Sequence, residues 1–474
     1  MADTAPNHVY TLNPIDQTHS RAYIRYAFCF PYTDKDTAPI SNHFIAKLKR
    51  TVTQLPILAG NVRPVRTEHG GDGQQRGCVE VAVTLAKVLS FSPTFRSLDK
   101  DEFPHTYEEL VETGMPAGAF INENLSALPD VAEAQDSPVF GVQLNYIPGG
   151  VIVAFSLHHS VGDLTSLRTI FSHLCSDLPS RKLSDIDLED DARDHSRQRD
   201  RLSGSRGIKT DLVLNSLPTP NKPTAAEAQR ILEGADVQSI GNVLFFKFKI
   251  IQGIQTIVND RFENIQNNRL ARVSKFDVLA AILWKGINRA RRECDAEYDD
   301  EGRVSTVVVP VNVRSKIQPP LDDTYFGNGI ISARATEKIM KLGMPYDPAT
   351  MAKAALQIRR SISAVGEDRV RSTVASVNKS ENVQETPVTE LNLSTDLVIT
   401  SWAGLVLEES DLGTGLGKAE YGRKFTRKDT NLGCIVYSPR EQEGLWEVNV
   451  QLEKRTMDCL LEDEHFMQHV VKVA

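Results

Sequence analysis

The segment SLHHSVGDL, residues 156–164, contains the residue types that general-base chemistry requires. His159 is followed four positions later by Asp163. A histidine has a pKa close to neutral and can take a proton from a substrate at physiological pH. The spacing alone carries little information, because the chain has 11 histidines and the same spacing recurs at His173 and Asp177. The surrounding sequence has to separate the two pairs.

The two pairs stand in different local patterns. His173 lies in LTSLRTIFSHLC, whose apolar residues recur at helical spacing, so His173 and Asp177 are expected on a solvated helix face. His159 ends a run of alternating residues and shares one strand face with Val151, Val153, Phe155 and Leu157. A histidine at a strand end can point into a cleft from a rigid base. Two structural interpretations stay open: His159 as a hydrogen-bonded core residue, and Asp163 as the N-cap of the next helix.

The elements that must position these residues alternate between helices and strands. Residues 141–160 are typical of a β-hairpin around Pro148-Gly149-Gly150, and 274–292 of a helix with a capping box at Ser274 and Asp277. Further strands are expected at 303–316, 395–407, 432–439 and 445–453. This order predicts an α/β or α+β fold with mixed sheets.

A change in composition predicts the domain boundaries. Residues 179–225 are charged, contain several prolines and have few aromatic residues, which is typical of an exposed linker. The linker would separate an N-terminal domain, 1–178, from a C-terminal domain, 226–474. A second polar stretch, 366–390, is expected to mix helix with a surface loop.

The composition restricts the class of protein. A chain of 474 residues with 41% hydrophobic and 24% charged residues has the balance of a globular protein. Its net charge of −8 and the absence of long basic runs argue against nucleic-acid binding. No signal peptide or membrane span is recognised in the sequence, so we expect a cytoplasmic protein. The six scattered cysteines contain no C-x-x-C pair, which predicts reduced thiols and no metal site.

Five ordered segments resemble one enzyme family. His159–Asp163 is similar to the H-x-x-x-D motif of coenzyme A-dependent acyltransferases of the BAHD superfamily, in particular the fungal trichothecene 3-O-acetyltransferase branch. The other segments are VSKFDVLAAILWKGINRAR, VPVNVRSKIQPPLDDTYFGNG, TSWAGL and Asp411–Gly415, the last where the family has D-F-G-W-G. Leu164, Leu412, Thr414 and Asn312 depart from the family pattern.

This resemblance implies a fold and an activity. It implies two similar chloramphenicol-acetyltransferase-like domains with a channel at their interface, and His159 midway along it. His159 would remove the proton of a hydroxyl or amine on a small-molecule acceptor, a fungal secondary metabolite, as it attacks the thioester of acetyl-CoA directly, without an acyl-enzyme. Acetyl-CoA would be a co-substrate, with no permanently bound cofactor. A monomer is expected from the family.

The resemblance also implies roles for individual residues. Asp163 would point away from the substrate and pair with Arg314. Asp411 and Gly413 would support the site structurally. Ser401 and Trp402 would border the channel, with core packing as the alternative for Trp402.

Two other functions compete with this interpretation. A free-standing condensation domain of peptide synthesis, which takes acyl groups from carrier proteins, also matches through its H-H-x-x-x-D motif at His158–Asp163. A relative that binds without catalysis is the other alternative, and the altered D-F-G-W-G motif is its only support. A nucleotide-triphosphate loop at 411–419 is disfavoured, because Leu412 and Ala419 break the G-x-x-x-x-G-K-[ST] pattern.

Overall fold

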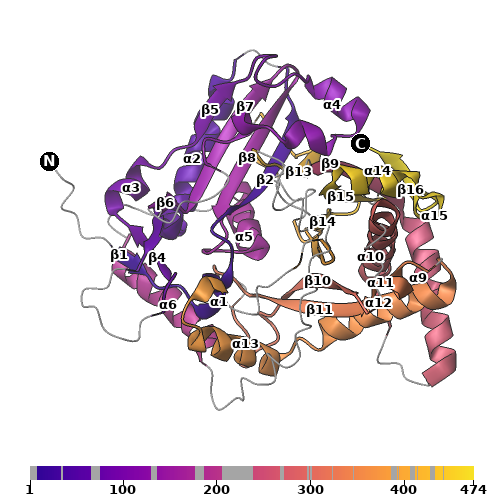
Figure 1. Ribbon diagram of the computed structural model, residues 1–474. Coiled ribbons are helices and arrows are strands. Elements are labelled where there is room, and N and C mark those ends of the chain that lie inside the picture. Colours follow the sequence, from indigo (N-terminus) through magenta and orange to yellow (C-terminus); the bar gives the residue numbers. More distant parts are fainter. Residues whose placement is uncertain are drawn as a thin grey trace.

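The computed structural model describes most of the chain. The described residues are 8–33, 36–65, 75–129, 136–176, 186–204, 239–266, 272–295, 298, 302–322, 324–344, 346–385, 392, 394–405, 411–413, 415–427, 433–440 and 442–474. Within these ranges the strands form three sheets, and helices cover them (Figure 1).

Hydrogen bonding between neighbours sets the order of the strands in each sheet. In this order, the seven described strands of the first sheet are β11 (Ile330–Lys338), β10 (Val304–Asn312), β12 (Leu397–Ser401), β14 (Gly433–Val436), β15 (Leu445–Glu453), β9 (Ser239–Lys247) and β16 (Val470–Val473). The five of the second are β13 (Tyr421–Lys424), β2 (Tyr23–Pro31), β8 (Gly150–His158), β7 (Phe140–Ile147) and β5 (Thr94–Ser97). The four of the third are β1 (His8–Tyr10), β4 (Val79–Val83), β3 (Asn61–Pro64) and β6 (Ser137–Pro138).

The helices fall into two groups along the chain. Those before residue 205 are α1 (Pro14–Thr18), α2 (Ala38–Gln54), α3 (Leu85–Ser90), α4 (Tyr107–Thr113), α5 (Leu164–Cys175) and α6 (Leu188–Ser203). Those after residue 238 are α9 (Phe248–Gln266), α10 (Lys275–Cys294), α11 (Ile339–Leu342), α12 (Pro348–Ser363), α13 (Glu367–Lys379), α14 (Lys454–Glu462) and α15 (Glu464–Met467). Short 3₁₀ turns lie at Pro56–Ala59, Ala117–Phe120, Glu123–Leu125 and Val383–Glu385.

The five-stranded sheet is covered on both faces, which explains why β8 is buried along its whole length. Val151, Val153, Phe155 and Leu157 belong to a core that also contains apolar residues of α2 and α5. Ile152 and Ala154, on the opposite face, pack in a separate core with residues of α4. The expected hairpin is confirmed, because β7 and β8 pair antiparallel through 140–147 and 150–157.

The core beside the seven-stranded sheet is formed largely by the helix α10. Ser274 caps α10 in a reciprocal capping box with Asp277, as expected. The helix is buried along most of its length, and the indole N–H of Trp284 donates a 2.9 Å hydrogen bond to Ser305 Oγ on β10. β12 runs parallel to β10 and β14, whereas the other pairs of this sheet are antiparallel. The prediction of an α/β class with mixed sheets is therefore confirmed.

The segment expected to be an exposed linker differs from that expectation. Its described part, residues 186–204, contains the helix α6, and the side chain of Arg199 on this helix is only 2% exposed. Arg199 Nε donates to the buried carboxylate of Asp16, 3.1 Å away. The charged residues of α6 therefore include an internal ion pair, which composition alone does not reveal. Residues 179–185 and 205–225 of the predicted linker lie outside the described ranges.

The five-stranded sheet of the N-terminal half is completed by a strand from late in the chain. β13 pairs antiparallel with β2, from Tyr421 opposite Cys29 to Lys424 opposite Tyr26 (Figure 1). Leu405, Leu412 and Leu416 are buried in the core of that half. β13 and these three leucines, which the expected boundary assigns to the C-terminal domain, thus pack with the N-terminal sheet.

A buried ion pair fixes this crossing segment. Arg423 on β13 lies 2.6 Å from Glu447 on β15, and the two side chains are 1% and 3% exposed. Arg423 Nε also donates to the carbonyl of Met115, 2.9 Å away. The guanidinium therefore connects the five-stranded sheet with the seven-stranded one.

We predict that Glu447→Ala lowers the free energy of unfolding by about 3–5 kcal/mol, because it leaves the Arg423 guanidinium buried without its counter-charge. Denaturant unfolding of both proteins measures the difference. Glu189→Ala is the matched control, since Glu189 pairs with Arg193 at the surface and its side chain is 73% exposed. The control should unfold like the wild type. Equal losses in the two variants would contradict the prediction.

Candidate active site

Two adjacent histidines end the buried strand, and the structure gives them different surroundings. His158 is 1% exposed, packs edge-on against Tyr23, and accepts a hydrogen bond at Nδ1 from the backbone N–H of Ser160. Burial lowers the pKa of His158 to about 3. His159 follows the last residue of β8, and its N–H donates to the carbonyl of Ala22, 2.9 Å away. His158 is therefore a core residue, and His159 is the one that reaches a cavity.

Asp163 is held by five hydrogen bonds. Its Oδ1 accepts from the N–H groups of Thr165 and Ser166 at 2.9 and 3.1 Å, which makes it the N-cap of α5. Arg314 donates to both carboxylate oxygens at 2.8 and 3.0 Å. The N–H of Gly329 donates to Oδ2 at 2.9 Å. The structure thus brings Asp163 and Arg314 together and also gives Asp163 the capping position.

The segment around Gly329 must approach the guanidinium closely. Arg314 Nη2 donates to the carbonyl of Gly327 at 2.7 Å. A Cβ atom at Gly329 would lie 2.7 Å from Arg314 Nη1, so only glycine leaves room for the guanidinium. The Oγ of Ser166 bonds to both the N–H and the C=O of Gly327. These contacts join the start of α5 to the loop before β11.

A cavity of about 210 Å³ contains His159 and is lined by both halves of the molecule. His19 and His159 form one wall, together with residues of α1. The rest of the lining consists of apolar residues of β10, β11 and β12 and of the polar side chains of Ser332, Arg334, Arg369 and Thr373. β12 contributes a single residue because successive side chains of a strand point to opposite faces. Val398 faces the cavity, whereas Leu397 and Ile399 pack in the core around α10.

Burial is the main influence on the protonation of His159. It lowers the pKa of the imidazole below its ordinary value of 6.5, and the negative charge of Asp163 opposes this shift. The imidazole is therefore neutral near pH 7, the form that can accept a proton. His19 stacks on it with ring centroids 4.4 Å apart and an interplanar angle of 13°.

A second buried carboxylate supports the backbone of His159. Asp16 accepts from the N–H and the side-chain amide of Asn328 at 2.8 and 3.0 Å, and that amide also donates to the carbonyl of His159 at 2.8 Å. Arg199 pairs with Asp16 and donates to the carbonyl of Val161. Burial raises the pKa of Asp16, and the charge of Arg199 lowers it again.

The sequence analysis missed His19, Asp16, Arg199 and Asn328 as parts of the site. Asn13 and Asp16 have the spacing of a capping box, which they form, but that pattern does not point to His159. Arg199 lies in a run of charged residues, and nothing in that local sequence indicates that this one side chain is buried. Asn328 lies within the segment TYFGNG that resembles the family. The resemblance singled out this segment, but it did not predict that Asn328 contacts His159.

The expectation that Ser401 and Trp402 border the channel does not fit this cavity, which neither residue lines. β12 ends at Ser401, on the face opposite to Val398 by strand alternation. Trp402 is 9% exposed and packs in the N-terminal core, with its ring 5.6 Å from Tyr26 and 6.3 Å from Tyr437. Trp402 is therefore a core residue, which was the alternative interpretation of this tryptophan.

Asp411 and Gly413 lie away from this cavity, on the loop that leads into β13. The Asp411 carboxylate accepts a 2.8 Å hydrogen bond from the N–H of Gly413. Gly413 has a φ of +89°, and a Cβ there would lie 2.6 Å from His43 Nε2 on α2. Leu412 occupies a buried position in the N-terminal core. The geometry is that of a tight turn packed on α2.

Two further observations concern the described residues alone. No group of three or more His, Cys, Asp or Glu side chains there has an arrangement that could hold a metal ion. Among the helices of the described ranges, none combines the length and apolar character needed to cross a bilayer. His173 lies on α5 as expected, and its partner in the second H-x-x-x-D pattern, Asp177, falls outside the described residues.

Comparisons with known proteins agree with this fold. Residues 119–467 match the model of the Transferase family, and residues 22–177 match the trichothecene 3-O-acetyltransferase-like N-terminal domain. Acyltransferase easC of Emericella nidulans is 23% identical, over 97% of this chain and 95% of its own. Eremophilane O-acetyltransferase prx11 of Penicillium rubens is 25% identical, over 95% and 96%. The crystal structure of F. sporotrichioides TRI101 with coenzyme A and T-2 superimposes with a TM-score of 0.73 at 18% identity, covering 98% and 99% of the two chains.

The fold and these relatives define the chain as an acyltransferase with a two-domain architecture. The family model covers about three quarters of the sequence. The chain belongs to the Transferase family.

We predict that Arg314→Met lowers the free energy of unfolding by about 3–5 kcal/mol, because the Asp163 carboxylate stays buried while its counter-charge is lost. Arg314→Lys should lose less, since an ammonium keeps the charge but cannot donate to both carboxylate oxygens in parallel. Denaturant unfolding of the three proteins gives the order. A methionine variant as stable as the wild type would show that the pair contributes nothing.

Proposed function

We propose that the protein transfers an acetyl group from acetyl-CoA to a hydroxyl group of a secondary metabolite, with His159 as the general base. The observation that carries the proposal is the position of His159: its imidazole lines a cavity between the two halves and has a lowered pKa. The names of the relatives support the reaction class, and the coenzyme A in the crystals of F. sporotrichioides TRI101 supports the co-substrate.

The reaction proceeds by direct transfer. Nδ1 of His159 is buried, which leaves Nε2 to meet the acceptor. Nε2 takes the hydroxyl proton as the acceptor oxygen attacks the thioester carbonyl carbon, and a tetrahedral oxyanion forms. When this intermediate collapses, the carbon–sulfur bond breaks, and the imidazolium returns the proton to the sulfur of coenzyme A. Acceptor and thioester thereby become acetyl ester and free thiol.

Asp163 acts as a positioning residue in this scheme. All of its hydrogen bonds run to Arg314, to the start of α5 and to Gly329, and none of them runs to His159. The carboxylate therefore holds the loop that carries the base and does not relay the proton. Arg314 stabilises Asp163 in that position.

The acceptor is proposed to be a small molecule with a largely apolar body. The cavity beside His159 combines valine, isoleucine and proline side chains with a similar number of polar ones, among them Thr18, Ser332 and Thr373. Such a site suits a hydroxylated terpenoid or a similar metabolite. The names of relatives such as eremophilane O-acetyltransferase point the same way.

We predict that His159→Ala lowers the release of coenzyme A from acetyl-CoA by about 10²–10⁴-fold, because the base is lost. The measurement is chromatographic detection of coenzyme A over a panel of hydroxylated terpenoids and amines. His173→Ala is the matched control, since His173 has the same H-x-x-x-D spacing but lies on α5 outside the cavity. Equal activity of wild type and His159→Ala would exclude His159 as the base.

The same assay separates the competing functions. A condensation-type domain would leave free acetyl-CoA untouched and would need a carrier-bound thioester. A binding relative without catalysis would release no thiol, yet acetyl-CoA would raise its melting temperature, because a ligand that binds the native state alone stabilises it.

We predict that kcat/KM falls at acidic pH with a midpoint below 6.5. Only neutral His159 can take the proton, and burial shifts its pKa below that value. Activity is therefore complete above the lowered pKa and is lost as the pH falls through it. Initial rates at saturating acetyl-CoA across pH 4.5–8 would locate the midpoint. A midpoint above 6.5 would contradict the assignment.

A further inference from the structure

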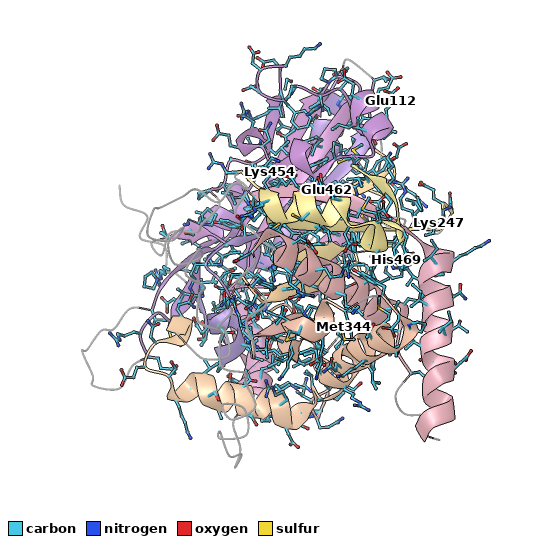
Figure 2. All side chains as sticks on the ribbon, turned by 45° about the vertical axis from the view of Figure 1, so that its right-hand side comes forward. Glu112, Lys247, Met344, Lys454, Glu462 and His469 are labelled. Carbon is cyan, nitrogen blue, oxygen red and sulfur yellow. The ribbon has the colours of Figure 1, made fainter. Side chains whose placement is uncertain are left out.

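Two cysteines that are far apart in the sequence lie in contact where α14 packs on α10 in the C-terminal half. Cys294 is the last residue of α10, and Cys459 lies on α14, 165 positions later. α14 lies across α10 in Figure 2, where Lys454 and Glu462 mark its two ends. The Sγ atoms of the two cysteines are 2.6 Å apart.

This separation is shorter than an ordinary contact between unbonded sulfur atoms. A disulfide bond is about 2.05 Å long, so the two sulfurs need to approach by only about 0.5 Å to become bonded. Both cysteines sit on packed helices, with Leu460 of α14 and the apolar residues of α10 in one core. The packing of α10 against α14 therefore holds the two cysteine side chains next to each other.

The surroundings of the pair favour sulfur chemistry over metal binding. Cys294 is 8% exposed and its S–H donates to the carbonyl of Arg455 at 3.2 Å, whereas Cys459 is half-buried. Within the described residues, no third His, Cys, Asp or Glu joins the two sulfurs in a possible metal site. A pair of thiols at this distance has one common reaction, which is oxidation to a disulfide.

We propose that Cys294 and Cys459 form a reversible redox pair that glutathione disulfide converts into a disulfide between α10 and α14. In the first step the thiolate of one cysteine attacks glutathione disulfide, breaks its S–S bond and releases one glutathione thiolate. In the second step the other cysteine attacks the mixed disulfide and releases the second glutathione. Two protein thiols and one glutathione disulfide thus become one protein disulfide and two glutathione molecules.

The exposure of the two sulfurs sets the order of these steps. Cys459 is reached from solvent and attacks first, whereas burial raises the pKa of the Cys294 thiol and keeps it protonated. Cys294 then attacks the sulfur of Cys459 in the mixed disulfide at close range, and its proton passes to the glutathione thiolate that leaves. The closed loop spans 165 residues and contains most strands of the seven-stranded sheet. A cross-link of this length restricts the unfolded chain strongly.

The test is incubation of the full-length protein with millimolar glutathione disulfide, followed by mass spectrometry and peptide mapping without reduction. The oxidised protein should be lighter by about 2 Da, contain a peptide that joins Cys294 to Cys459, and regain its thiols with dithiothreitol. Its melting temperature should rise by about 3–6 °C relative to the reduced form.

Three variants make the test specific. Cys459→Ser should lose the joined peptide and the rise in melting temperature, and Cys294→Ala should retain a glutathione adduct at Cys459. Cys434→Ser is the matched control, because Cys434 is buried on β14 in the same half and should leave the disulfide intact. Glutathione adducts alone in the wild type, or a joined peptide that involves another cysteine, would overturn the proposal. None of these readouts depends on acyl transfer.

Discussion

The carboxylate of Asp163 is the buried charge around which the site is organised. Removing a carboxylate from water costs several kcal/mol, so it is tolerated only where other groups replace the lost hydration. In this protein a guanidinium and three backbone N–H groups do so. Two of these groups lie at the start of α5, and the others lie between β10 and β11. The requirement to neutralise one carboxylate thus brings the two halves of the chain together beside His159.

His159 and Asp163 are arranged unlike the histidine and carboxylate of a Ser-His-Asp triad. In a triad the carboxylate bonds to the imidazole and fixes its tautomer. In this protein the carboxylate is turned away, and the histidine is held through its backbone instead. Ala22 accepts from its N–H, and Asn328 donates to its carbonyl. The imidazole therefore lies at the end of the strand, stacked on the ring of His19.

Local periodicity accounts for the parts of the fold and site that the sequence predicted. Alternation along β8 predicts the two faces of the strand as far as His158, and the capping box at Ser274 marks the start of α10. The pairing of Asp163 with Arg314 was expected from motif order in the resembling family, since no local pattern links positions so far apart. The places of Ser401 and Trp402 were expected from the same resemblance, and no local pattern in the sequence shows whether a residue just after a strand lines a cavity or packs in a core.

Long-range contacts between polar residues could not be predicted in the same way. Asp16, Arg199 and Asn328 meet from three distant segments, and each residue taken alone is typical of a cap, a charged surface or a loop. The same holds for β13, whose four residues carry no sign that they pair with β2. A charged side chain can be buried only where an oppositely charged or hydrogen-bonding partner meets it. Here that partner comes from a distant part of the sequence, so no local pattern predicts the burial.

The place of β13 has a consequence for biosynthesis. A ribosome makes β2, β7 and β8 long before β13, which closes the edge of that sheet, and before Leu405, Leu412 and Leu416, which fill part of its core. Until then the edge of β2 has unpaired backbone groups, and apolar surface on the sheet stays open. Unpaired edges and exposed apolar surface are the features that make folding intermediates aggregate. The N-terminal half is therefore expected to mature only after translation is nearly complete, and to depend on chaperones during that interval.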